Sequence, residues 1–60
     1  MNETEIIEYA KSLLDAHGDA AEAEAAQKAR EAEEKGDAQA AEDWQRVRAA
    51  ISSMRGSHTS

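Results

Sequence analysis

The residues of this sequence that could carry chemistry are few and scattered. Asp15, His17 and Asp19 stand at alternate positions and offer the oxygen and nitrogen ligands that divalent metals use. Alternate residues that cross the end of a helix do not converge on one point unless the turn brings them together. Each also suits a structural role, because Asp19 can cap a helix, His17 fits the negative end of a helix dipole and Asp15 fits solvent. We therefore expect no metal site.

A nucleophilic site is equally hard to assemble. The chain has no cysteine, and only His17 and His58 could act as the base for a serine. Most of the glutamates lie on an alanine-rich stretch with no apolar pocket to raise a carboxyl pKa. A chain of 60 residues can also hardly enclose a pocket of several hundred Å³. The sequence predicts no enzymatic activity, no cofactor and no small-molecule substrate.

The residues with the clearest spacing belong to packing or recognition. An apolar stripe that includes Trp44 recurs at steps of three and four residues, the spacing of a coiled-coil seam about two heptads long. Tryptophan is common among interface anchors, but one that shares a stripe with aliphatic residues also fits a core, so both roles of Trp44 stay open. The predicted partner-binding residues are the seam and the arginine beside it: Trp44, Val47, Ile51, Met54 and Arg48.

Two Gly-Asp breaks divide the chain into the helices that must position these residues. The expected helices cover about 3–17, 20–35 and 38–55, and they are separated at Gly18-Asp19 and Gly36-Asp37. Glycine commonly ends a helix, and aspartate commonly caps the next one. Aligning the two breaks matches further residues as well, but alanine-rich composition inflates such matches. An internal duplication therefore stays an open question.

Each expected helix has its own side-chain pattern. The first begins with Asn2 and Glu5 as a capping box, or with Thr4 as a rival cap, and carries large apolar residues on one face. The second contains alanine and charged residues with no large apolar one, and the third carries the seam. Because each break is short, we expect an all-α fold, a small antiparallel three-helix bundle over 1–56 followed by a disordered tail at 57–60.

The expected core is thin for a domain of this size. Hydrophobic residues make up 40% of the sequence, and more than half of these are alanine. The large side chains of the first and third helices should pack on each other over the alanine face of the second. A domain of about 60 residues buries only about 60% of its unfolded surface. The bundle is therefore a candidate for dimerisation.

The stretch Ala32–Ala41 resembles the turn that joins the two helices of a tetratricopeptide repeat. The resemblance rests on Gly36-Asp37 and the small residues after it, and it covers at most residues 19–56. It implies that the second and third helices form one helix-turn-helix hairpin with an adaptor-like role, since that family builds peptide-binding surfaces. The chain as a whole is also similar to short helical proteins of bacteria.

Charge and hydropathy restrict the classes of partner. The formal net charge is −6, and the acidic excess lies in the first two helices. Nucleic-acid binding needs a clustered basic surface and is disfavoured. The longest apolar run is too short to span a membrane, and the acidic start is unlike a signal peptide, so a cytoplasmic location is expected.

Two functions follow from these patterns. The first is a small protein-interaction module that uses the seam of the third helix to form a homodimer or to bind a protein partner. The alternative is an acidic regulator or inhibitor that binds a basic protein surface through the first two helices. In the alternative, the binding residues would be Glu22, Glu24, Glu31 and Glu33.

Overall fold

Three α-helices and one short 3-10 turn make up the described part of the chain, residues 1–56 of a computed structural model. In chain order these are α1 (Glu3–His17), the 3-10 turn η1 (Gly18–Ala20), α2 (Ala21–Glu34) and α3 (Ala38–Gly56). Residues 1–56 contain no β-strand, so the predicted all-helical class is confirmed. The tail expected at 57–60 lies outside the described residues.

The start of α1 is fixed by local hydrogen bonds. The backbone N–H of Glu5 donates to Oδ1 of Asn2 at 2.8 Å, and the backbone N–H of Asn2 donates to Oε1 of Glu5 at 3.3 Å. This reciprocal pair satisfies two donors that have no partner within the helix. The predicted capping box is therefore confirmed, and Asn2 rather than Thr4 is the cap.

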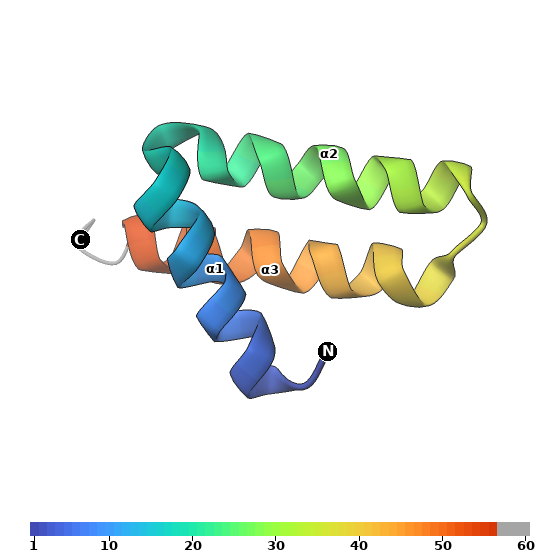
Figure 1. Ribbon diagram of the computed structural model, residues 1–60, viewed down its shortest axis with the longest axis horizontal. Coiled ribbons are helices and arrows are strands. Elements are labelled where there is room, and N and C mark those ends of the chain that lie inside the picture. Colours follow the sequence, from blue (N-terminus) through green and yellow to red (C-terminus); the bar gives the residue numbers. More distant parts are fainter. Residues whose placement is uncertain (57–60) are drawn as a thin grey trace.

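The junction between α2 and α3 reverses the chain. The N–H of Asp37 donates to the carbonyl of Ala32 at 2.9 Å, and the N–H of Gly36 donates to the carbonyl of Glu33 at 3.0 Å. This is the Schellman pattern, and Gly36 takes the positive φ of 76° that the pattern requires. The N–H of Ala40 donates to Oδ1 of Asp37 at 3.1 Å, which confirms Asp37 as the cap of α3. Helices α2 and α3 lie antiparallel and side by side (Figure 1).

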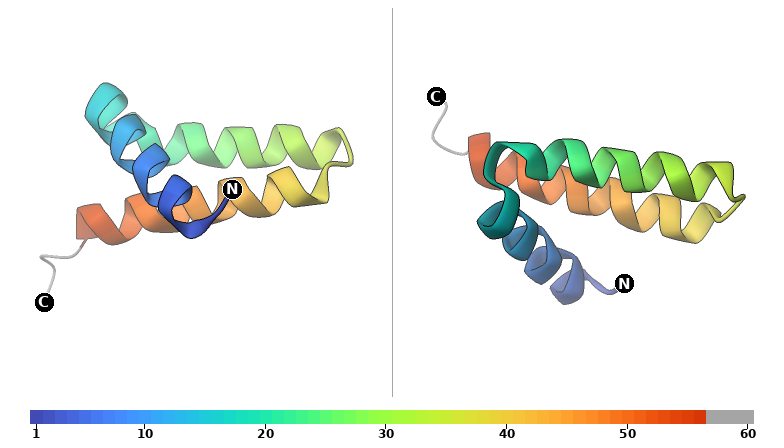
Figure 2. Two further views of the ribbon diagram at one scale, coloured as in Figure 1. Left: turned by 60° about the horizontal axis from the view of Figure 1, so that its bottom comes forward. Right: turned by 45° about the horizontal axis from the view of Figure 1, so that its top comes forward.

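The junction between α1 and α2 differs from the prediction. Asp19 was expected to cap α2, but Ala20 precedes the helix and makes no side-chain capping bond. The chain continues through η1 with no non-helical residue, although Gly18 has a φ of 56°. With no loop to turn it back, α1 crosses the other two helices obliquely (Figures 1 and 2). The expected antiparallel three-helix bundle is thus wrong in one respect, because only α2 and α3 are antiparallel.

The core forms where the three helices meet. Each helix contributes two residues to a buried cluster: Ile6 and Ala10 from α1, Ala21 and Ala25 from α2, and Val47 and Ile51 from α3. The alanines keep α2 close to its neighbours, while the large side chains come from the other two helices. The packing of α1 and α3 over an alanine face was predicted and is confirmed.

A buried carboxylate ties the beginning of the chain to α3. Asp43 is only 8% exposed, and the ammonium group of Met1 donates to its Oδ2 at 2.9 Å. The side-chain amide of Gln39 donates to Oδ1 at 3.3 Å. The hydrogen bond from the ammonium group, together with its charge, lowers the pKa of Asp43 below the ordinary value of 3.8. This contact helps to hold α1 across α3.

Candidate interaction surface

Two residues of the predicted seam lie inside the molecule. Val47 and Ile51 are both 0% exposed and pack against α1 and α2 within the chain. A partner could reach them only if the helices separated. The hypothesis that all four seam residues bind a partner therefore needs correction, because the chain itself covers the middle of the seam.

Trp44 lies at the edge of the core. Its ring meets that of Tyr9 edge to face, with the ring centroids 5.1 Å apart and the planes at 87°. This is a favourable geometry for two aromatic rings. Trp44 is half-buried and packs against the core, while Tyr9 remains 43% exposed. Contacts within the chain therefore account for the buried part of Trp44.

Arg48 and Met54 do not share a site. Arg48 is exposed and lines a shallow hollow together with Glu22, Gln45 and Ser52. Met54 instead lines two adjoining hollows between α1 and α3. The two residues are six positions apart on α3, so the structure places them on different sides of that helix.

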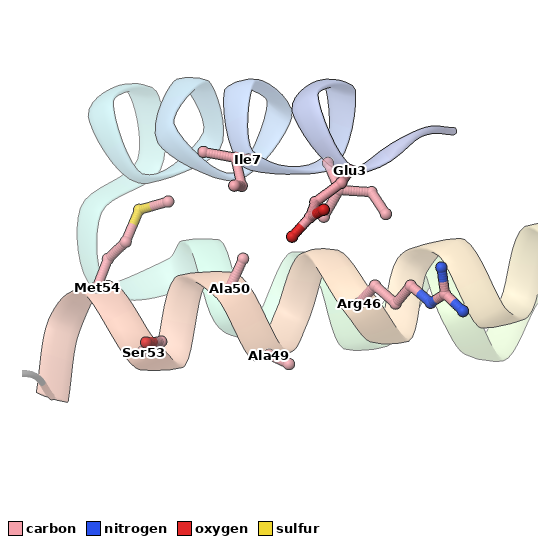
Figure 3. A pocket seen from close by; sticks show the side chains of 8 residues that line it. Glu3, Ile7, Arg46, Ala49, Ala50, Ser53 and Met54 are labelled. Carbon is pink, nitrogen blue, oxygen red and sulfur yellow. The ribbon is translucent and has the colours of Figure 1, made fainter.

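The two hollows that share Met54 form one open groove between α1 and α3. The hollow that Ile7 lines has a volume of about 590 Å³ and an apolar floor. Figure 3 shows Glu3 and Ile7 of α1 and Ala50 and Met54 of α3 turned toward the space between the two helices. We call this surface the α1/α3 groove, and its residues are Glu3, Ile6, Ile7, Lys11, Ser12, Leu14, Asp15, Arg46, Ala49, Ala50, Ser53 and Met54.

The exposure of Ile7 is the feature of the groove that contacts within the chain do not explain. Its side chain is 43% exposed, whereas that of the preceding Ile6 is 5% exposed. Consecutive residues on an α-helix point about 100° apart, so one isoleucine faces the core and the next faces the groove. The sequence contained this signal, because two neighbouring isoleucines cannot both lie on the centre line of one buried face.

The charges around the groove are balanced. Glu3 and Arg46 line one end, and Lys11 and Asp15 line the other. The groove therefore offers an apolar floor with carboxylates and cations of both signs at its rim. Such a surface is suited to burying apolar side chains and to fixing their register by ion pairs, which is the usual division of roles in a protein interface.

Other acidic side chains are engaged within the chain. Nδ1 of His17 lies 2.9 Å from Oε2 of Glu24. The guanidinium group of Arg55 contacts Oδ1 of Asp19 at 3.3 Å and Oε1 of Glu22 at 3.2 Å. These pairs link the end of α3 to the junction of α1 and α2. Two of the four glutamates expected on a free acidic face, Glu22 and Glu24, thus already have cationic neighbours.

The groups considered for metal binding do not converge. His17 and Asp19 turn to different partners, and no group of three or more histidine and acidic side chains within 1–56 could hold a metal ion. No helix of this described part has the length and apolar character needed to cross a membrane.

Comparison of the chain with protein-family models, with curated proteins and with solved structures gives no significant match. The α1/α3 groove and the chemistry of its residues are what the chain itself offers for a function.

Proposed function

We propose that this chain is a small protein-interaction module and that the α1/α3 groove is its contact surface. The observation that carries the proposal is the exposure of Ile7, a large aliphatic side chain held 43% exposed beside an apolar floor. Burying apolar surface stabilises an interface by about 25 cal/mol per Å². A complex in which a partner covers Ile7 would be stabilised by this free energy, and the core of the chain would stay intact.

The proposal keeps the function expected from the third helix and changes the residues. Met54 remains part of the surface, while Val47 and Ile51 support it from inside and Arg48 lies outside it. The likeness of residues 19–56 to a tetratricopeptide-like hairpin supports an adaptor-like role, since that family binds peptides on helix surfaces.

The acidic-regulator alternative has less support. It needs the carboxylates of α1 and α2 to be available to a basic partner, yet Glu22 contacts Arg55 and Glu24 contacts His17. Glu31 and Glu33 remain exposed on α2, but they lie outside the groove. If α2 instead binds a basic protein surface, a crosslinking probe on α2 should give the product.

Site-specific photocrosslinking in the native cell tests the proposal. A benzophenone amino acid is placed at position 7 in one variant and, as a matched control, at Arg30 on the exposed side of α2 in another. We expect a discrete crosslinked protein product from position 7 and none from the control. Equal products from both positions, a product only from α2, or no product at all would contradict the proposal.

A further inference from the structure

We propose that the occupant of the α1/α3 groove is helix α1 of a second copy of this chain, lying antiparallel with a two-fold axis at Ile7. This inference rests on the proposed function, because it names the partner of the same surface. It depends on a charge pattern that is complementary to itself.

Three exposed residues of α1 carry that pattern. Glu3, Ile7 and Lys11 are spaced four residues apart and therefore follow one row along the helix. All three line the α1/α3 groove. With a rise of 1.5 Å per residue, an acid and a base lie about 6 Å on either side of the central isoleucine along the helix axis.

Reversing a copy of this row about Ile7 places each charge opposite its complement. Glu3 of one chain then faces Lys11 of the other, and the two-fold axis creates the same pair a second time. An interface of this kind uses one patch on both copies and closes on itself. Two ion pairs would flank a central contact between the two Ile7 side chains.

The floor of the groove suits an approaching helix. Ala50 has a small side chain that points toward α1, and it lies between Met54 and Arg46 along α3 (Figure 3). Small residues let helix axes come as close as about 8 Å, the short end of the usual packing range. A second α1 helix could thus bring its own isoleucine onto this floor.

The same observations argue against a basic partner in the groove. The whole chain carries a net charge of −6, which would attract a basic surface in general. The groove itself carries two cations, Lys11 and Arg46, beside its acids Glu3 and Asp15. A strongly basic partner would meet both of these cations, whereas a second copy places its Glu3 opposite Lys11.

Sedimentation equilibrium of the purified full chain and of charge-reversal variants tests the inference. We expect the wild type to dimerise, and we expect Glu3→Lys and Lys11→Glu, each alone, to weaken dimerisation about tenfold, because like charges then face each other at both pairing positions. Mixing the two variants in equal amounts should restore association, since each then presents the complement of the other.

The matched control is Glu8→Lys. Glu8 is exposed on α1 and lines a different hollow with Met1, Glu5 and Tyr9, and its reversal changes the net charge by the same amount as Glu3→Lys. Because a smaller net charge reduces repulsion between copies, this variant should dimerise at least as well as the wild type. Circular dichroism checks that every variant is helical. The mixture contains the same two variants that are measured alone, so a loss of stability in either one cannot explain tighter association in the mixture.

The results that overturn the inference are distinct from those that overturn the proposed function. A wild type that stays monomeric at millimolar concentration, or a mixture no tighter than its components, excludes the second copy. A crosslinked product from position 7 whose mass is not twice that of the chain also excludes it, yet such a product keeps the groove as a protein-binding surface. A product of twice the chain mass supports the inference.

Discussion

The neighbouring isoleucines of α1 allow a direct test of how this helix is rotated. Ile6→Ala and Ile7→Ala make the same chemical change at adjacent positions of the same helix, one 5% and the other 43% exposed. The groove exists only if Ile6 faces the core and Ile7 faces away from it. We expect Ile6→Ala to destabilise the chain much more than Ile7→Ala.

The expected difference follows from burial. Converting isoleucine to alanine removes three carbon groups at about 0.8 kcal/mol each when fully buried, and a cavity in the core raises the total to about 2–5 kcal/mol for Ile6→Ala. At Ile7 the exposed fraction removes nearly half of the transfer free energy. The higher helix propensity of alanine offsets roughly another 0.4 kcal/mol there, which leaves a loss of about 1 kcal/mol.

Urea and thermal unfolding of both variants, followed by circular dichroism, measure this difference. The midpoint temperature changes by about 4–8 °C per kcal/mol in a domain of this size, so Ile6→Ala should unfold at a clearly lower temperature than Ile7→Ala. The measurements need a protein concentration at which sedimentation shows a monomer, because a dimer would bury Ile7. Equal losses, or a larger loss for Ile7→Ala, would mean that α1 is rotated and that the groove is not present.

The two Gly-Asp junctions and the buried carboxylate give two further tests. Asp37→Ala should cost about 0.5–2 kcal/mol of stability because it removes the cap of α3. Asp19→Ala should cost much less, because Asp19 is fully exposed and its ion pair with Arg55 lies at the surface. Thermal unfolding of both variants measures the two losses, and equal losses would contradict the assigned junctions. Because folding lowers the pKa of Asp43, its contribution is present above 3.8 and is lost as the pH falls below that value toward the folded pKa. The wild type should therefore lose stability more steeply than Asp43→Asn in urea titrations below that pH, and parallel curves would refute the role of this carboxylate.

Local chemistry explains which predictions were confirmed. The capping box at Asn2, the cap at Asp37 and the Schellman turn at Gly36 each depend on groups within five residues of one another. The sequence contains all of the groups that such motifs need. The helix bounds, within one residue of those expected, depend on the same local bonds. The expected packing of the other two helices over the alanine face of α2 is also observed.

The candidate surface could be predicted only in part. Met54, one of the predicted partner-binding residues, lines the α1/α3 groove, and the neighbouring isoleucines at positions 6 and 7 are visible in the sequence. The seam residues Val47 and Ile51 have the same spacing whether a partner or the chain itself covers them. Periodicity indicates that a face is apolar, but it does not indicate which helix covers that face.

By itself the sequence determined three helical segments, the caps of α1 and α3, and the faces that must be buried. Only the tertiary structure decided that Gly36-Asp37 reverses the chain while Gly18-Asp19 bends it. The difference depends on packing between residues far apart in the chain, such as the buried cluster that brings Ile6 of α1 together with Val47 and Ile51 of α3. The same crossing of α1 over α3 leaves Ile7 exposed and creates the groove. Hydrogen bonds between residues a few positions apart are determined by the local sequence. Which helix covers the apolar face of another depends on how the whole chain packs.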